Sequence, residues 1–354
     1  MQENKQEHFI KNIEIKNFKC FEDFKAEGFG RVNLIGGKNN VGKTALMEAL
    51  ELIINSNDSY SLSHSLRTLL KRRQSTNRND RYFELDFIYK DANTMELKTS
   101  NKNILVEYFE DFPEYTNELS EDTNLFIAHE PSLKLTINND EKIFSIDRII
   151  NRPIMSRRPF ESNKETKINF IASSTTSEQD IAILYGKLID INKEDFLNES
   201  LQLFDSNIIA LKQKATDRNI ILKLSLKNRE LPVLLSSLGE GVNRYIAILS
   251  AIWASQNGFL FIDEIENGLH YSNYSKLWTI ILKASKQAKC QIFISTHSKE
   301  CIESFNRVQK DLEDKNTYYF EMFKNKKEDK IEMRALDQEQ LEYELQHGEG
   351  FRGE

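Results

Sequence analysis

Residues 31–44 read Arg31-Val-Asn-Leu-Ile-Gly-Gly-Lys-Asn-Asn-Val-Gly-Lys-Thr44, and this stretch decides the fold. Val32 to Ile35 predict a short buried strand, and the periodic apolar residues after Lys43 predict a helix to about Ile54. Between them, Gly37-x-x-x-x-Gly42-Lys43-Thr44 fits the phosphate-binding pattern G-x-x-x-x-G-K-[ST]. Because the pattern lies between a strand and a helix, the sequence predicts a P-loop rather than an ordinary glycine turn.

The residue types of this loop suit a polyphosphate ligand. Glycines allow the backbone to curl so that successive N–H groups point at phosphate oxygens, and the positive end of the helix dipole lies at the same place. Lys43 is expected to reach the β- and γ-phosphates, and the Thr44 hydroxyl is expected to hold Mg²⁺. The predicted nucleotide-binding residues of the loop are Gly37, Lys38, Asn39, Asn40, Val41, Gly42, Lys43 and Thr44.

Composition sets broad limits on the protein class. The 354 residues are 39% hydrophobic and 29% charged, which predicts a globular chain of one large or two smaller domains. The formal net charge of −7 argues against a surface coated in basic charge for nucleic acid, although a local basic patch remains compatible with it. Cys20, Cys290 and Cys301 are scattered without metal-ligand spacing, which suits a reducing compartment.

The sequence shows no targeting or membrane signal. The polar first eight residues lack an apolar signal core, and no apolar run approaches the length of a membrane span. We therefore expect a soluble cytoplasmic protein with no membrane partner.

Outside the motif-rich segments, the sequence predicts both strands and helices, which suggests an inserted α+β region. Residues 9–21 alternate like an edge strand, and residues 82–89, 103–108, 133–137 and 142–146 predict further short strands. Helices are expected over 177–191 and 193–204, followed by strands near 208–212 and 219–226. The expected division is an N-terminal head part at 1–90, an arm or lid at 91–229, and a C-terminal head part at 230–354.

A second phosphate-site element follows at Gly258-Phe-Leu-Phe-Ile-Asp263-Glu264. The unbroken apolar run predicts a strand buried on both faces, with the form of a Walker B strand. Asp263 would then end the strand beside the P-loop and hold Mg²⁺. Glu264 is expected to act on the attacking water as general base or water-positioning residue.

Ser237-Leu-Gly239-Glu240-Gly241 precedes a predicted helix and resembles the signature sequence of ABC-type ATPases, in the S-x-G-E form of SMC-like and RecF-like proteins. The resemblance implies that Ser237, Gly239 and Glu240 contact the ATP bound by another copy, so that ATP and Mg²⁺ are enclosed in a homodimer or higher oligomer. Ser237 is also expected to cap the helix.

Two further segments carry the same resemblance. His297, at the end of the apolar stretch 290–297, matches the switch histidine that contacts the γ-phosphate, and completes a predicted catalytic set with Glu264 and Lys43. Residues 266–270 correspond to the D-loop at the dimer seam; whether His270 lies near the nucleotide is left open.

The chain most resembles the ATPase domain of the OLD (overcoming lysogenisation defect) family in a stand-alone form, and the ATPase subunits of the PARIS and Septu phage-defence systems. The implied fold is an α/β P-loop NTPase, an ABC-type ATPase head with an inserted α+β arm or lid. No clear Q-loop glutamine is found, Gln74 being the nearest candidate. The 57 residues after His297 contain no D-x-D metal pair, so a TOPRIM nuclease domain is not expected there.

Three functions fit these features. The first is a regulatory ATPase that holds or releases a separate effector, a nuclease or toxin, in defence against phage. The second is a RecF-like or SMC-like ATPase that clamps DNA, for which the basic stretches 71–81 and 152–158 are candidate phosphate contacts to DNA or RNA. The third is a scaffold that binds ATP structurally.

Overall fold

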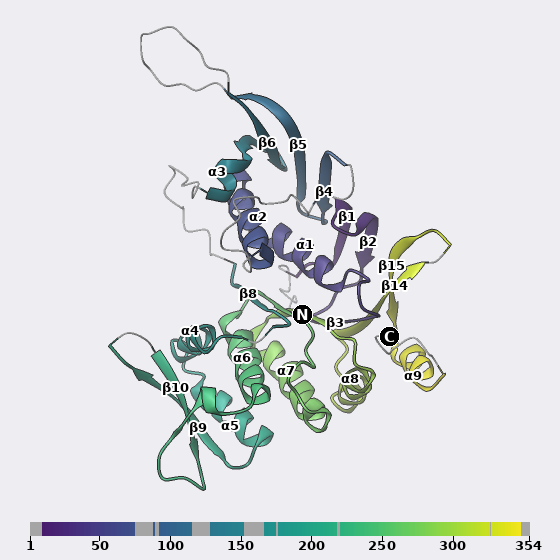
Figure 1. Ribbon diagram of the computed structural model, residues 1–354. Helices are drawn as coiled ribbons and strands as arrows, with labels where there is room; N and C mark the ends of the chain where they lie inside the picture. The colour runs from purple at the N-terminus through teal and green to yellow at the C-terminus, as the bar shows by residue number, and fades with distance from the viewer. Residues whose placement is uncertain are drawn as a thin grey trace, which may run out of the picture.

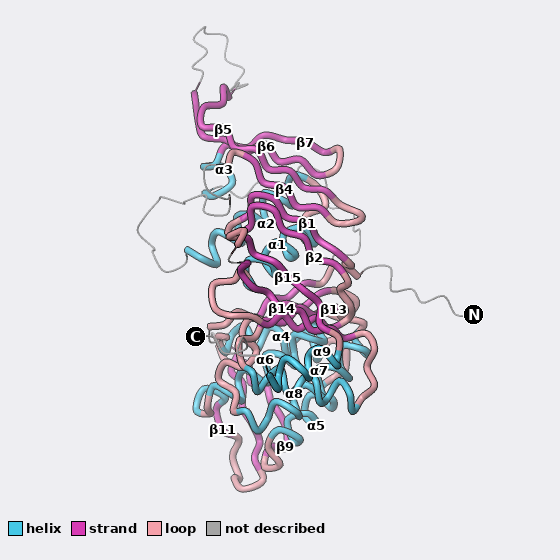
Figure 2. The backbone as a smooth tube through the Cα atoms, turned by 90° about the vertical axis from the view of Figure 1, so that its right-hand side faces the viewer, coloured by secondary structure: helices cyan, strands magenta, loops and turns pink. Residues whose placement is uncertain are grey.

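The computed structural model describes residues 9–74, 88, 92–114, 128–151, 166–174, 176–217, 220–325 and 327–347. These residues form four stacked layers, seen in Figure 1 and edge-on in Figure 2: an antiparallel sheet, a pair of helices, a mainly parallel core sheet, and a layer of helices on the far face. The two apolar cores lie on opposite faces of the core sheet.

The core sheet has the order β15-β14-β3-β13-β12-β8. Its strands are β15 (Lys330–Leu336), β14 (Thr317–Asn325), β3 (Val32–Gly36), β13 (Gln291–Ser295), β12 (Phe259–Ile262) and β8 (Ile168–Ile171). Neighbours are parallel except for β14 and β15. Every residue of β3, β12 and β13 is buried, as expected for strands covered on both faces. Because β3, β13 and β12 run in the same direction, their carboxyl ends lie at one edge.

Helices cover both faces of this sheet. One face carries α1 (Lys43–Asn55) and α2 (Ser59–Gln74), which lie between the two sheets. The other carries α4 (Glu178–Ile189), α5 (Glu194–Phe204), α6 (Glu240–Ala254), α7 (Tyr274–Ala288) and α8 (Lys299–Asp311), with α9 (Gln338–His347) packed on α8. Every residue of α6 from Arg244 to Ala254 is buried, so α6 is the central helix of its layer.

The antiparallel sheet has the order β2-β1-β4-β5-β6-β7. Its strands are β1 (Asn12–Phe18), β2 (Phe21–Glu27), β4 (Thr94–Lys98), β5 (Asn103–Glu114), β6 (Ala128–Ile137) and β7 (Asp140–Ser145), and the short α3 (Ile146–Asn151) follows β7. Its inner face is apolar. On its outer face charges are paired across strands, as between Lys16 and Glu96 at 3.5 Å and between Lys134 and Glu141 at 3.1 Å.

A small third sheet joins β9 (Ile208–Ala215), β10 (Ile220–Leu226) and β11 (Val233–Leu234). It leads into a 3₁₀ turn at Leu235–Ser237 and then into α6. Leu222 and Leu224 of β10 are buried in the same core as α4 and α6.

Most predicted elements lie close to their observed bounds, with clear exceptions. The single strand predicted over 9–21 is wrong, because the chain reverses at Lys19 and Cys20 to form the β1–β2 hairpin. The predicted strand 82–89 and the basic residues 152–158 lie outside the described residues, apart from Ile88, which forms an isolated bridge to Phe18. Helices α2 and α8 were not predicted.

The division into parts at residues 90 and 229 remains a prediction. Strand pairing shows how residues 91–229 are distributed: β4 to β7 extend the antiparallel sheet, β8 pairs with β12 in the core sheet, and α4 packs on α6. Sequence periodicity predicted β5, β6, β7 and α4 but not β4 or β8, and it gave no information on which elements pair.

Candidate active site

The P-loop residues 37–42 connect β3 to α1 through unusual backbone conformations. Gly37 has φ 141°, Asn40 φ 62° and Gly42 φ 87°. A Cβ atom on Gly37 would come within 2.3 Å of the Met322 main-chain oxygen, and one on Gly42 within 2.8 Å of Cys20 Sγ. Glycine is therefore required at both positions. The N-terminus of α1 has no side-chain cap, so its N–H groups face the loop unshielded by a capping side chain.

Lys43 is buried in the loop. Its ammonium group donates to the main-chain oxygens of Gly37 and Lys38, at 2.7 Å each. Burial lowers the pKa of Lys43, and the carboxylates of Glu266, Glu264 and Asp263 oppose that shift. Lys38, Asn39 and Asn40 form the exposed turn of the loop, and Val41 is buried beneath it.

Thr44 and Asp263, the two predicted metal ligands, are in direct contact. Thr44 Oγ1 donates to Oδ2 of Asp263 at 3.0 Å and lies 3.2 Å from Oδ1. Ser295, at the end of β13, donates to Oδ1 at 2.5 Å. Burial raises the pKa of Asp263, the bonds from Ser295 and Thr44 lower it, and the charges of Glu264 and Glu48 raise it further.

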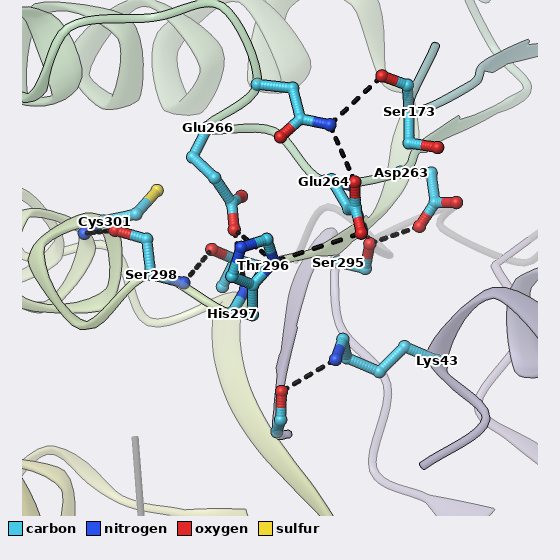
Figure 3. Close-up of polar contacts among 12 residues, drawn as sticks. Lys43, Ser173, Asp263, Glu264, Glu266, Ser295, Thr296, His297, Ser298 and Cys301 are labelled. Carbon is cyan, nitrogen blue, oxygen red and sulfur yellow. Dashed lines mark hydrogen bonds and ion pairs between the residues drawn. The ribbon is translucent and has the colours of Figure 1, made fainter. Parts of the chain in front are cut away.

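Glu264 follows Asp263 with φ 48°, a left-handed conformation that turns the chain out of β12. Its carboxylate accepts a hydrogen bond from Asn267 Nδ2 at 2.7 Å, and the same amide donates to the main-chain oxygen of Ser173 at 3.1 Å. The Glu264 main-chain N–H donates to Ser295 Oγ at 2.8 Å. Glu264 is thus held at both its main chain and its side chain, and Figure 3 shows the contacts of its carboxylate.

His297 lies between two carboxylates (Figure 3). Its Nδ1 is 3.1 Å from Glu266 Oε1 and 4.0 Å from Glu264 Oε1. Its main-chain N–H also donates to Glu266 Oε1, at 2.7 Å. The structure therefore brings Glu264 and His297, both predicted as catalytic, to the same edge of the sheet as Thr44 and Asp263.

Arg244 is a site residue that sequence reasoning missed. It lies on α6, is 5% exposed, and donates to the main-chain oxygens of Ala172, Asp263 and Glu264. Burial lowers its pKa, and the carboxylates of Asp263, Glu266 and Glu264 oppose the shift. An arginine directly before the apolar helix sequence Tyr245-Ile-Ala-Ile-Leu would have been the signal.

The signature segment differs from the prediction in one respect. Ser237 belongs to the 3₁₀ turn, and Gly239 is the N-cap of α6 with no side-chain cap, so the expected capping by Ser237 is wrong. Ser237, Gly239 and Glu240 are exposed. The segment packs on the D-loop of its own chain, because a Cβ on Gly241 would lie 2.6 Å from the Gly268 main-chain oxygen.

Two residues that sequence reasoning left open have local partners. Nδ1 of the exposed His270 lies 2.9 Å from Ser272 Oγ, and the centre of its ring lies 4.3 Å from that of the Tyr271 ring. Arg72, from the basic stretch 71–81, pairs with both oxygens of Glu51 at 2.7 Å and lies 4.3 Å from the centre of the Phe170 ring. These contacts give Arg72 a structural role; Arg78 and Arg81 lie outside the described residues.

The site fits a magnesium nucleotide. Thr44 and Asp263 present a hydroxyl and a carboxylate, the hard oxygen ligands that Mg²⁺ takes alongside phosphate oxygens. The positive φ angles of Gly37, Asn40 and Gly42 curl the loop in a way that suits main-chain N–H groups turned toward a phosphate, and Lys43 adds a cation beside them. These groups would hold ATP and Mg²⁺.

Comparisons with known proteins agree with this geometry. The family described as "AAA domain, putative AbiEii toxin, Type IV TA system" matches residues 32–303. A Helicobacter pylori protein named ATP/GTP phosphatase is 27% identical over 383 residues, covering 97% of this chain and 100% of the relative. An uncharacterized protein of Methanocaldococcus jannaschii is 34% identical over 95 residues, 27% of this chain and 42% of the relative.

A solved structure supports the fold. An SMC head bound to the C-winged helix domain of ScpA has a TM-score of 0.50 at 12% identity, and the match covers 94% of this chain and 99% of that chain. The predicted α/β fold of a P-loop ATPase head is confirmed. Within the described residues, no helix combines the length and the apolar character needed to cross a membrane.

Proposed function

The chain belongs to the family described as "AAA domain, putative AbiEii toxin, Type IV TA system", an ATPase of the ABC/SMC-like type, and from this premise we propose that two copies close around ATP and Mg²⁺ and hydrolyse the nucleotide to control a separate effector. The observation that carries the proposal is the contact of Thr44, at the start of α1, with Asp263, which directly follows β12 and precedes Glu264.

Each residue has a role set by its contacts. Main-chain N–H groups of residues 37–42 and Lys43 bind the phosphates, and Thr44 and Asp263 hold the metal, which neutralises phosphate charge when bound. Glu264 is 35% exposed at its side chain, so it can reach a water molecule, and Asn267 fixes its orientation. His297 presents its free ring nitrogen to the γ-phosphate.

The second copy completes the site in this proposal. Ser237, Gly239 and Glu240 lie exposed at the start of α6, where a helix N-terminus suits a phosphate group. Leu231 and Leu234, shortly before this segment in the chain, are 79% and 40% exposed, and Tyr271, shortly after the D-loop that packs on Gly241, is 67% exposed. Exposed apolar groups beside a polar phosphate-binding segment support a contact with another protomer.

The proposed effector is a nuclease or toxin encoded by another gene, in an OLD-like defence system. The family description names a toxin and a toxin–antitoxin system, which supports such a setting. A DNA clamp is less favoured, because charges on the outer face of the antiparallel sheet are paired and Arg72 is engaged by Glu51.

The test is purification from the native operon with ATP, followed by identification of the co-purifying chains and a hydrolysis assay. A co-purified protein that is toxic when freed by ATP hydrolysis is the expected result. Hydrolysis stimulated by duplex DNA and weakened by salt, with no bound protein, would contradict effector control and support a clamp. Tightly held nucleotide without turnover would instead indicate a scaffold.

A further inference from the structure

Glu266 is a buried acid that lies at the centre of the site and carries no role in the proposal above. The residue is 9% exposed, whereas the side chains of Glu264 and His297 are 35% and 34% exposed. Its Oε1 accepts the main-chain N–H of His297 and lies 3.1 Å from Nδ1 of the same residue. Both contacts of this oxygen are therefore with His297.

The second carboxylate oxygen of Glu266 adds to the free-energy cost of burying this side chain. Among the described residues, Glu266 Oε2 is buried without a hydrogen-bond partner. A buried polar atom left unsatisfied costs about 1–3 kcal/mol, and more when it is charged. An acid kept in such a position is poorly explained by stability alone, and a functional role accounts for it.

We propose that Glu266 is a positioning residue that holds the His297 ring with Nδ1 toward its own carboxylate, leaving Nε2 as the atom offered to the γ-phosphate. This inference rests on the proposed function, because His297 acts on a bound nucleotide. The 3.1 Å approach of Nδ1 to Oε1 does not have the geometry of a hydrogen bond, and such contacts commonly align when the substrate binds.

The carboxylate of Glu264, which also lies near the His297 ring, is hydrogen-bonded to another residue. Glu264 accepts from Asn267 at 2.7 Å and stands 4.0 Å from Nδ1, so Glu266 is the closer acceptor for the ring. A carboxylate on one imidazole nitrogen fixes which nitrogen is free for the other partner. By holding the ring, Glu266 also keeps His297 from forming a hydrogen bond with the Glu264 carboxylate. That carboxylate therefore stays available to act on the attacking water.

Glu266 further links the ring to the D-loop. Its main-chain oxygen accepts from the Leu269 N–H at 3.0 Å, and Gly268 of the same turn packs against Gly241 at the start of α6. If a second copy displaced the signature segment, the movement would therefore be transmitted to the His297 ring through Gly268, Leu269 and Glu266. The ring position then depends on the D-loop as well as on the nucleotide.

The test is a double-mutant cycle on ATP hydrolysis. Glu266→Gln keeps the shape of the side chain, and the expected effect is a fall of about 10–100-fold in kcat with KM and binding of a non-hydrolysable ATP analogue little changed. His297→Ala should lose at least as much, and adding Glu266→Gln to it should cause no further loss. The matched control is Glu303→Gln, an exposed acid on α8, which should hydrolyse ATP like the wild type.

Equal fold losses from Glu266→Gln in the wild-type and His297→Ala backgrounds would overturn the inference, because independent effects multiply. Nitrogen-15 spectra of the His297 ring give a readout without turnover: the ring shifts should change in Glu266→Gln and stay unchanged in Glu303→Gln. Unchanged shifts in Glu266→Gln would overturn the inference even if hydrolysis fell. A wild-type chain that binds ATP but never hydrolyses it would overturn the proposed function, while the ring spectra would still decide whether Glu266 holds His297.

Discussion

Thr44 donates a hydrogen bond to Asp263 at 3.0 Å although 219 positions separate the two residues. The contact exists because the P-loop strand β3 and the strand β12 end at the same edge of the core sheet, one strand apart. It places the two expected metal ligands together before any nucleotide is considered.

Replacing Thr44 by Val removes the hydroxyl and keeps the side-chain volume. Because Mg²⁺ would lose one protein oxygen ligand, the Mg²⁺ concentration for half-maximal hydrolysis should rise while the fold is retained. Titration of hydrolysis with Mg²⁺ measures the effect, and Thr279→Val on α7 is the control. An unchanged Mg²⁺ requirement would remove Thr44 from the metal site.

The apo chain should become more stable when Asp263 is replaced by Asn. Folding raises the pKa of this buried carboxyl, so its ionised form at pH 7 lowers the free energy of unfolding, and the penalty fades as pH falls toward the unfolded-state value of about 3.9. Thermal unfolding with chelator should show a higher midpoint for Asp263→Asn at pH 7 and a smaller gain at pH 5. A variant less stable than the wild type at pH 7 would contradict this account.

Glu264→Gln should separate binding from hydrolysis. The amide keeps the bond with Asn267 but cannot take a proton from water, so turnover should fall by at least about 100-fold while ATP binding persists. Single-turnover hydrolysis and a binding titration measure the two quantities. Turnover equal to that of the wild type would show that another group activates the water.

Arg244 should be needed for stability as well as for activity. Arg244→Met removes the donor to three main-chain oxygens, of which the Asp263 oxygen is in a buried bond and the Glu264 oxygen keeps only the Asn267 N–H, so we expect a loss of about 3 kcal/mol in the free energy of unfolding. Arg244→Lys supplies a single ammonium and should recover only part of the loss. Denaturant unfolding of both variants tests this, and a Met variant as stable as the wild type would contradict it.

The sequence predicted the part of the site that depends on strand order and loop chemistry. An apolar run ending in Asp263-Glu264 and a second run ending at His297 predict parallel strands, and parallel strands present their ends at one edge. The glycine pattern predicts the P-loop because few residues other than glycine tolerate its φ angles. These inferences need only local sequence.

Residues that act on the main chain of distant segments could not be predicted this way. Arg244 contacts carbonyl groups, Ser295 bridges Asp263 and the Glu264 N–H, and Glu266 contacts His297, and none of these pairings has a fixed sequence spacing. The capping by Ser237 was wrong because the 3₁₀ turn moves the start of α6 to Glu240, and a short turn of this kind has no clear sequence pattern.

The central claim is that one chain binds the nucleotide and another completes its site, and a mixing experiment tests it most directly. Lys43→Met removes the cation that we propose binds phosphate, and Ser237→Arg should block the signature segment, so each variant alone should hydrolyse almost no ATP. Mixed together, they should form dimers with one intact composite site and recover a substantial part of the wild-type rate. A mixture no more active than the two variants measured separately, with dimers present, would contradict the claim.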